Sequence, residues 1–450
     1  MNSLTLSMIV RDASAFLPSC LESVRGIAGE IVIADTGSTD DSIAIAQSFG
    51  ARVISIPWSN DFAEARNRAL AETKSDWVLS LDADEQLDPQ AAQQIPGLLK
   101  NSSIAGYQVT IRNYVLSLQD RVWDRTAIAN DFSLEAAKPY PAYVEHENVR
   151  LFRRDPEIYF VGRVHESVGP RILETKRGLD QAPFLIHHFG MVADEETRAR
   201  KNRFYRELGR QKIKEMPKNA QAHLELGLVE LDNFGNLAEA RRLFERACKL
   251  NPRFSQAWFF QGITLLKLEH HAEALRCLAE AERLGHRTAL VAETRGDAHY
   301  NLGHFAQAEQ CYETALHRDP QNTSLESKLG IAAVRAGKIA RGIQCLRHAV
   351  SSHQALPESH DHLVLALVSL DDLPEAAKAA ENKLRAIANP TAGDFLRAAS
   401  LAAKLRDWQR ALSILEQGLE KYPSEPRLQQ GFEEATRSAN QHDLVNTLNT

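Results

Sequence analysis

Three carboxylates lie within four positions at the end of an apolar segment of the chain. Residues 77–85 read WVLSLDADE, so that Asp82, Asp84 and Glu85 follow a strand-like run. Carboxylates this close repel one another, and each raises the pKa of its neighbours unless a positive charge lies between them. A solvated acidic turn before a helix is the plainer interpretation, because Pro89 could open such a helix. The pattern predicts a cation-binding site at the end of this strand.

A second carboxylate ends another apolar segment, EIVIAD, and a turn follows it. Residues 35–40 read DTGSTD, in which Gly37 permits a tight turn and the next polar side chains can cap a helix. A turn and a cap explain this motif without any ligand, but neither requires Asp35. A carboxylate at the tip of a strand suits hydrogen bonding to a nucleoside. The missing G-x-G-x-x-G fingerprint argues against a nicotinamide-dependent enzyme.

These carboxylates end strands in an alternating pattern of strands and helices. Four short β-rich segments are predicted as strands: 4–10, 30–35, 52–57 and 77–82. Helical patterns lie between them, which predicts a mostly parallel sheet with helices on its faces. Ligands bind beyond the carboxyl ends of the strands in such sheets. Four residues whose side chains could bind a ligand or take part in catalysis are expected at that edge: Arg11, Asp35, Asp82 and Asp84.

The second half of the chain repeats with a period of 34 residues. Small residues recur in the first helix of successive units, with the larger Val364 interrupting a series made of Gly227, Gly262, Gly296, Gly330 and Ala399. A second series lies in the following helix, at Ala240, Ala274, Ala308, Gly342, Ala376 and Ala411. Small residues let paired helices approach closely, and this period is the tetratricopeptide signature. We therefore expect about six repeats, with a candidate capping helix after residue 425.

Composition narrows the class of protein further. The chain has 450 residues and a net charge of −6, which argues against a nucleic-acid-binding protein with a basic surface. No apolar run reaches the roughly 20 residues of a transmembrane segment, and the N-terminus lacks the basic start of a signal peptide. Five cysteines, an odd number, predict no disulfide framework. We expect a cytoplasmic protein, free or peripheral at the inner membrane surface.

An ordered series of motifs resembles one enzyme family. The series starts with SMIV, EIVIADTGSTD, WSNDFAEARNRAL and DWVLSLDADE, and it continues with RLFR at 150–153, GRVHE at 162–166 and HFGM at 188–191. Together these motifs resemble glycosyltransferase family 2, in the branch of lipopolysaccharide-core glucosyltransferases and sublancin-type peptide S-glycosyltransferases. The resemblance covers about residues 4–206, and fusion to tetratricopeptide-like helices also occurs in this family.

The resemblance implies a fold class and domain boundaries. The expected fold is an α/β GT-A domain, typical of nucleotide-diphospho-sugar transferases, followed by an all-α tetratricopeptide solenoid. The expected divisions are a catalytic domain over 1–193, a linker helix over 194–217 and the repeat array over 218–450.

The resemblance also implies a metal site. Asp82-Ala-Asp84 resembles the DXD motif, whose carboxylates hold Mg²⁺ or Mn²⁺ against the diphosphate of a nucleotide-sugar. Hard divalent cations prefer such oxygen ligands. His188 resembles the late histidine that completes the metal and phosphate shell in many GT-A enzymes. His187 stays open as its rival, because either ring could face the site.

Other residues match the nucleotide side of the family's donor site, to which Asp82 also belongs. Asp35 matches the carboxylate that contacts the nucleobase. Arg66 matches an arginine near the nucleotide, although an exposed arginine on an amphipathic helix is the alternative. Arg11 keeps a positive charge where relatives read Lys-Asn-Glu-Glu, but the paired glutamates are missing here, which makes a carried-over role for Asp12 doubtful.

An inverting transferase needs a general base that takes a proton from the acceptor. Glu166 in the GRVHE motif is the first candidate, and His165 either orients it or serves as the base itself. Residues 117–148 fit no regular element and are expected to shape the acceptor side.

The sequence thus predicts a metal-dependent inverting glycosyltransferase that moves a sugar from a nucleotide-sugar, with a UDP-sugar as the expected donor. The acceptor is expected to be a peptide, a protein or a cell-envelope glycan. The repeat array would recruit that acceptor or a protein partner through its groove. A tetratricopeptide interaction scaffold with an inactive glycosyltransferase-like domain is the alternative function.

Overall fold

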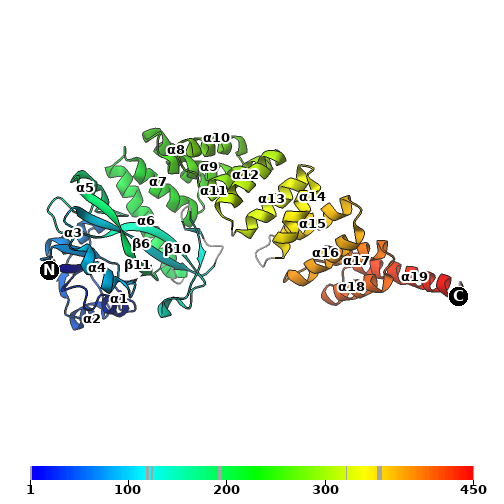
Figure 1. The fold of residues 1–450 in the computed structure, drawn as a ribbon, viewed down its shortest axis with the longest axis horizontal. Helices are drawn as coiled ribbons and strands as arrows, with labels where there is room; N and C mark the ends of the chain where they lie inside the picture. The colour runs from blue at the N-terminus through cyan, green and yellow to red at the C-terminus, as the bar shows by residue number, and fades with distance from the viewer. Residues whose placement is uncertain are drawn as a thin grey trace. The chain divides into compact units, whose positions relative to one another are not determined.

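The computed structural model describes residues 3–117, 121–122, 125–190, 195–320, 322–351 and 357–448. The chain forms two compact units, Met1–Leu250 and Asn251–Thr450. All strands of the described residues belong to the first unit, and the elements described in the second unit are helices (Figure 1). The predicted order of an α/β domain followed by a helical array is therefore confirmed.

Four parallel strands form one half of the sheet, in the order β3-β2-β1-β4. Their bounds are β1 (Leu4–Val10), β2 (Glu30–Asp35), β3 (Arg52–Ser55) and β4 (Trp77–Ser80). Apart from the half-buried Ile9, the aliphatic residues of β1 and β4 are buried, as expected for strands covered on both faces. The connecting helices are α1 (Leu17–Ser23), α2 (Ser42–Ser48) and α3 (Phe62–Ala71). The carboxyl ends of the four strands therefore meet at one edge of the sheet.

The other half of the sheet mixes strand directions. β10 (Ala142–Arg153) pairs antiparallel with β4 and with β6 (Ile104–Val115). β11 (Gly178–His188) runs parallel to β6 and antiparallel to β5 (Glu85–Leu87). The expected mostly parallel sheet is thus limited to the first four strands, because β10 returns directly alongside β6 without a helical crossover.

Short elements complete the first domain. They are α4 (Ala91–Leu98), β7 (Arg121–Val122), β8 (Arg125–Thr126), β9 (Ile128–Ala129), the 3₁₀ turn η1 (Glu135–Ala137) and α5 (Gly169–Glu174). The segment 117–148, expected to be irregular, contains β7, β8, β9, η1 and the start of β10, while residues 118–120 and 123–124 lie outside the described residues.

Strand register brings distant residues to the acidic turn after β4. His188 at the end of β11 is paired with Asn113 of β6 on one side and with Glu85 of β5 on the other. Leu151 of β10 is paired with Leu79 of β4, which puts Arg150 beside the end of β4. The sheet topology therefore concentrates polar residues at the edge where parallel strands bind ligands.

Helix α3 shows how local sequence orients one of these residues. Asp61 caps the helix by accepting a hydrogen bond from the backbone N–H of Glu64 at 3.0 Å. Ala63, Ala65 and Ala69 form its buried face. These small side chains let the helix lie close against its neighbours.

Helix pairs follow the α/β domain. The elements from the linker onward are α6 (Glu195–Glu215), α7 (Ala220–Leu228), the π-helical turn η2 (Val229–Asn233), α8 (Leu237–Leu250), α9 (Ser255–Lys267), α10 (His271–Arg283), α11 (Ala289–Asn301), α12 (Phe305–Arg318), α13 (Thr323–Arg335), α14 (Ile339–Val350), α15 (Pro357–Ser369), α16 (Leu373–Ala386), α17 (Ala392–Lys404), α18 (Trp408–Lys421) and α19 (Pro426–Leu448). The first compact unit extends through α8, so it includes α6 and the first helix pair.

Glycines mark the crossing points within the helix pairs. A Cβ atom at Gly262 would lie 2.7 Å from Cγ of Leu278, and one at Gly296 would lie 2.5 Å from the ring of Tyr312. Gly227 and Gly330 face Phe244 and Leu346 in the same way. Small residues are needed at these points because the partner helix supplies a large one, as the repeat pattern predicts.

The fifth unit, α15 and α16, reverses this arrangement. Val364 takes the place of the glycine, and Ala380 takes the place of the large residue 34 positions after Leu346; both are buried. Such an exchange conserves core volume. Lys383 replaces a further repeat alanine, and its ammonium lies 2.6 Å from Asp394 Oδ1 and 2.7 Å from Asp361 Oδ2.

Within the described ranges, no helix has the length and apolar character needed to cross a membrane.

Candidate active site

Asp82, at the end of β4, lies between two buried arginines. Its Oδ2 atom is 3.1 Å from Nη2 of Arg150 on β10, and its Oδ1 atom forms an ion pair with Arg66 on α3. Burial disfavours the charged form of Asp82, but the two guanidinium groups outweigh burial and hold its pKa well below the usual value. Two side chains of the protein therefore already supply positive charge to the first carboxylate of the DADE segment.

Arg66 connects this carboxylate to the GRVHE turn. Its Nε atom donates to Oε1 of Glu166 at 2.5 Å, and its Nη1 atom donates to Oγ of Ser80 at 3.2 Å. Only 4% of Arg66 is exposed, so the alternative of an exposed arginine on an amphipathic helix is excluded. Because a guanidinium stays charged and offers a planar fork of donors, Arg66 can hold Asp82 and Glu166 in a fixed relation.

Glu85 stabilises the acidic turn from its buried side. Its Oε2 atom accepts the backbone N–H of Asp82 at 2.8 Å, and its Oε1 atom lies 2.6 Å from Nη2 of Arg150. The side chain is 2% exposed, and burial raises its pKa to about 7. Glu85 therefore shapes the turn and holds Arg150.

Asp84 faces a different partner, His188. Its Oδ2 atom is 3.4 Å from Nε2 of His188, and its backbone carbonyl accepts the N–H of Phe189. Burial alone would disfavour the imidazolium of His188, but the hydrogen bond and charge of Asp84 raise the pKa of this histidine above its ordinary value. A Cβ atom at Gly190 would overlap the Asp84 carboxylate. The absence of a side chain at Gly190 thus leaves room for the Asp84 carboxylate beside Nε2 of His188.

The two adjacent histidines face opposite ways. His187 is fully buried, with Nδ1 2.8 Å from the hydroxyl of Tyr114 and Nε2 3.3 Å from Oδ2 of Asp88. Burial lowers its pKa and so favours the neutral ring, which connects β11 to Tyr114 of β6. His188, not His187, is the one beside Asp84.

The GRVHE turn places Glu166 and His165 differently. Gly162 has φ 101° and His165 has φ 55°, so the turn uses left-handed backbone at two positions. Glu166 points to Arg66, with its side chain 12% exposed. His165 is exposed, and its ring stacks on Tyr205 with centroids 6.5 Å apart. The structure therefore connects Glu166 directly to the Asp82 network and leaves His165 at its outer edge.

Asp35 ends β2, and Arg11 directly follows β1, the strand that lies between β2 and β4 in the sheet. The Asp35 carboxylate is buried and accepts the backbone N–H groups of Gly37 at 3.0 Å and Ser38 at 3.2 Å. Arg11 is exposed. Asp12, whose role the sequence left in doubt, binds the neighbouring turn by accepting the N–H of Thr39 at 2.7 Å.

Three residues of this region had no role in the sequence interpretation. Arg150 belongs to the RLFR motif, so a motif signal was present without an assigned function. Asn113 hydrogen-bonds to His188, and no motif pointed to it. Tyr205 of α6 stacks on Phe62 with centroids 6.1 Å apart. Burial, then the charges of Asp82, Glu166 and Asp84, raise the pKa of Tyr205, so its phenol lies within the field of these carboxylates.

The residues fit a divalent cation only in part. Among the described residues, no group of three or more histidine, cysteine, aspartate or glutamate side chains converges as a metal site. Asp84 and His188 offer one oxygen and one nitrogen, whereas Asp82 is engaged by arginines. Mg²⁺ typically binds through one or two carboxylates plus substrate phosphates and water. Asp84 and His188 therefore fit the role of the protein ligands in such a site, with phosphate oxygens and water as the others.

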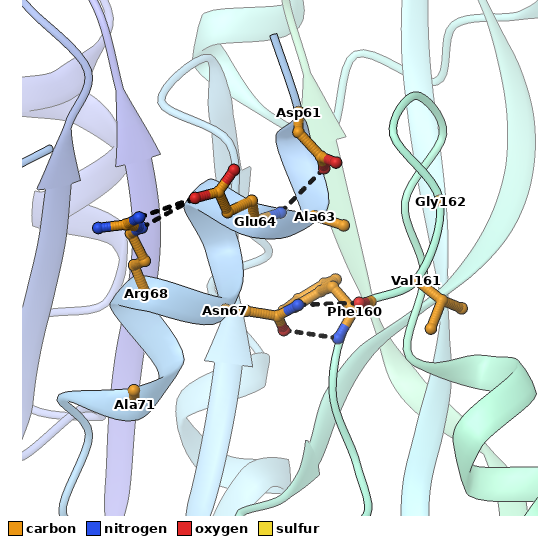
Figure 2. A pocket seen from close by; sticks show the side chains of 9 residues that line it. All are labelled: Asp61, Ala63, Glu64, Asn67, Arg68, Ala71, Phe160, Val161 and Gly162. Atoms are coloured by element: carbon orange, nitrogen blue, oxygen red, sulfur yellow. Dashed lines mark hydrogen bonds and ion pairs between the residues drawn. The ribbon is translucent and has the colours of Figure 1, made fainter. Parts of the chain in front are cut away.

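A separate cavity of about 550 Å³ lies along α3. Asn67 lines this cavity, and its side-chain amide bonds to the backbone N–H and carbonyl of Phe160 at 2.8 and 2.9 Å. Figure 2 shows these two bonds. Arg68 and Glu64 pair at its side, 2.8 Å apart. Its lining includes none of Asp82, Asp84 and Glu166, so it is distinct from the acidic cluster.

Comparisons with known proteins agree with this architecture. Residues 5–159 match the model of Glycosyl transferase family 2, and tetratricopeptide repeat models match 201–253, 230–285 and 289–322. The chain is 33% identical over 173 residues to a TPR repeat-containing protein of Synechococcus elongatus, covering 38% of this chain and 37% of that one.

Two named glycosyltransferases are also similar. The lipopolysaccharide core biosynthesis glycosyltransferase LpsC of Rhizobium meliloti is 31% identical over 200 residues, covering 43% of this chain and 66% of LpsC. The SPbeta prophage-derived glycosyltransferase SunS of Bacillus subtilis is 24% identical over 167 residues, covering 37% of this chain and 34% of SunS. The chain thus spans between about a third and two thirds of the length of these relatives.

Proposed function

Because this chain carries a glycosyltransferase family 2 domain fused to tetratricopeptide repeats, we propose that it is a glycosyltransferase that uses a nucleotide-sugar, with a UDP-sugar as donor. The observation that carries this proposal is the convergence of Asp84 and His188 beside the Arg66–Asp82–Arg150 network. This cluster lies where parallel strands end, the edge at which α/β sheets bind ligands.

Asp84 and His188 would hold Mg²⁺ or Mn²⁺ together with the donor diphosphate. Such an ion supplies Lewis-acid stabilisation of the departing phosphate. Asp82 stays with its two arginines and fixes the turn that presents Asp84. Asp35 and Arg11, at the neighbouring strand ends, would face the nucleoside and a phosphate of the same donor.

Glu166 is proposed as the general base of an inverting reaction. Its Oε1 atom is bonded to Arg66, which leaves Oε2 to accept the proton of the acceptor nucleophile. Arg66 connects this base to Asp82, so the donor and acceptor sides are held in one network. His165, exposed at the rim and stacked on Tyr205, is the alternative base.

The acceptor is proposed to be a peptide, a protein or a cell-envelope glycan, recruited by the repeat array on the cytoplasmic side of the membrane. Solenoids of this kind present extended binding surfaces. The alternative is an interaction scaffold with an inactive domain. Against it, Asp82, Asp84, Glu166 and His188 are all present, and each pairs with another side chain of this cluster.

A transfer assay with the full-length protein tests the proposal. Nucleotide-sugars are screened for donor hydrolysis and transfer, with Mn²⁺ and with a chelator. Asp84→Asn is expected to reduce turnover by at least about 100-fold without unfolding, because it removes a charged ligand. Glu64→Gln, in the separate cavity along α3, is the matched control and is expected to keep normal turnover. No turnover with any donor, or full turnover in Asp84→Asn, would contradict the proposal.

A further inference from the structure

Asn113 is the hydrogen-bond partner of His188 on the side away from Asp84. Its Oδ1 atom lies 2.8 Å from Nδ1 of His188, and the asparagine is 3% exposed. The two residues are paired across β6 and β11 at the carboxyl ends of both strands. The same imidazole thus has one nitrogen toward Asn113 and the other toward Asp84.

The orientation of the Asn113 amide is determined by its surroundings. Its Nδ2 atom donates to the backbone carbonyl of Val144 at 2.9 Å and to that of Ile111 at 3.3 Å. A reversed amide would turn its oxygen toward these two carbonyl oxygens, which cannot donate a hydrogen bond. Oδ1 therefore faces His188.

This orientation has a consequence for His188. An amide oxygen only accepts hydrogen bonds, so Nδ1 of His188 must carry the hydrogen. In the neutral ring, Nε2 is then left with its lone pair, and Nε2 is the atom 3.4 Å from Oδ2 of Asp84. A lone pair beside a carboxylate is suited to a cation between them, as in sites where an outer residue sets the tautomer of a histidine ligand.

A third side chain supports the same arrangement. Nδ1 of His146 lies 2.7 Å from Nδ2 of Asn113. Burial, then the positive charge of Arg150, lower the pKa of His146 to about 4, so this ring is neutral near neutral pH and can accept the amide hydrogen. Each nitrogen-bound hydrogen of Asn113 therefore has an acceptor, and the amide has no reason to reverse.

We propose that Asn113 is a positioning residue that fixes His188 in the Nδ1–H tautomer and directs Nε2 to a divalent cation shared with Asp84. The inference rests on the metal step of the proposed function and adds to it a residue outside every recognised motif. Asn113 itself does not contact the cation or the donor.

The tautomer is measured first, in the metal-free wild-type protein, at a pH above the raised pKa of His188 so that the ring is neutral. Selective ¹⁵N labelling of histidine, with His188→Gln to assign its signals, distinguishes a protonated Nδ1 from a protonated Nε2 by NMR. We expect the Nδ1–H form of His188. A dominant Nε2–H form would overturn the inference without any variant of Asn113.

Mn²⁺ affinity in the presence of UDP is measured next, by electron paramagnetic resonance. Asn113→Leu removes the acceptor and is expected to weaken Mn²⁺ binding by about 10- to 100-fold. Asn113→Asp keeps an acceptor oxygen toward His188, and its second oxygen, when protonated, can donate to the Val144 carbonyl in place of the amide, so we expect it to restore most of the affinity. Tyr114→Phe is the matched control, because it removes the neighbouring hydrogen bond to His187 and should leave Mn²⁺ affinity unchanged.

The outcomes separate this inference from the proposed function. Equal affinity in wild type and Asn113→Leu would overturn the positioning role while the metal step stands. A wild-type protein that binds no Mn²⁺ with any nucleoside diphosphate would overturn the metal step, and the positioning role with it. If Asn113→Leu does not fold, the wild-type tautomer still decides the question.

Discussion

Arg66 and Glu166 are 100 positions apart in the chain, yet Nε of the arginine lies 2.5 Å from Oε1 of the glutamate. The same guanidinium is ion-paired with Asp82, so one buried cation connects the end of β4 to the GRVHE turn. In the proposed reaction these two carboxylates belong to the donor and acceptor sides. Arg66 therefore sets the distance between the departing phosphate and the general base.

Replacing Arg66 by lysine tests whether the role of this residue depends on its positive charge alone or also on the planar shape of its guanidinium. Lysine keeps one positive charge but lacks the planar fork that reaches both carboxylates, so we expect turnover to fall by about 100-fold through misplacement of Glu166. Arg66→Met should also destabilise the domain by about 3–5 kcal/mol, because two carboxylates lose a buried partner. Transfer kinetics and urea unfolding measure the two effects. Arg68→Lys, in an exposed pair on the same helix, is the control; equal turnover in Arg66→Lys and Arg68→Lys would refute this role.

Gly190 offers a second test of the metal-binding pair. Its missing side chain leaves space for the Asp84 carboxylate, and an added Cβ would lie 2.9 Å from Nε2 of His188. We expect Gly190→Ala to weaken Mn²⁺ binding and turnover together by about 10-fold or more, because it displaces both candidate ligands. Gly97→Ala, where a Cβ meets nothing within 4 Å, should change neither quantity. Unchanged Mn²⁺ affinity in Gly190→Ala would show that Asp84 does not bind the ion in this position.

The linker helix α6 provides a third test, because adjacent residues face two parts of the first unit. Tyr205 stacks on His165, while Arg206 pairs with the fully buried Glu230 through contacts of 2.7 and 2.8 Å. Glu230 lies in the π-helical turn η2 of the first repeat, and such turns often occur at functional positions. We expect Arg206→Met to destabilise the first unit by about 3–5 kcal/mol, since it leaves a buried carboxylate without its main partner.

Arg206→Met should also lower turnover by displacing Tyr205 from the site. Thermal unfolding and transfer kinetics measure the two effects, with exposed Arg203→Met as control. If turnover per folded molecule stays normal in Arg206→Met, the first repeat does not support the site through α6.

The sequence predicted the local parts of this structure well. The four N-terminal strands and the tight turn at Gly37 each depend on neighbouring residues, whose types carry the signal. The sequence interpretation assigned Asp82 and Asp84 to a metal, and this assignment stays a prediction. The structure adds that Arg66 and Arg150 form ion pairs with Asp82.

The remainder depends on strand order and register, which a single sequence does not encode locally. The sequence could not show which of His187 and His188 lies beside Asp84, because the direction of each side chain depends on the pairing of β11 with β6 and β5. Asn113 and Tyr205 carry no motif, and their partners lie 75 and about 40 positions away along the chain. Such contacts become visible only when the antiparallel half of the sheet is in place.

The buried lysine of the fifth repeat gives a final prediction, on pH. Burial opposes ionisation of Asp394, but its hydrogen bonds from Lys383 and Thr391 outweigh burial and lower its pKa. A carboxylate with a lowered folded-state pKa adds stability above its unfolded pKa, near 4, and loses that contribution as the pH falls through the folded value. Asp394→Asn should therefore destabilise α17 by about 1–3 kcal/mol at pH 7, and the difference from wild type should shrink below about pH 4.

Hydrogen exchange of the α17 amides in the full-length protein, measured at several pH values, checks this prediction. Asp371→Asn serves as control, because Asp371 is exposed and its left-handed backbone, at φ 59°, suits asparagine. We expect α17 protection in this control to follow wild type at every pH. The loss of protection in Asp394→Asn could instead stay constant down to pH 3. The source of the stability would then be the role of Asp394 in capping α17, and not its charge.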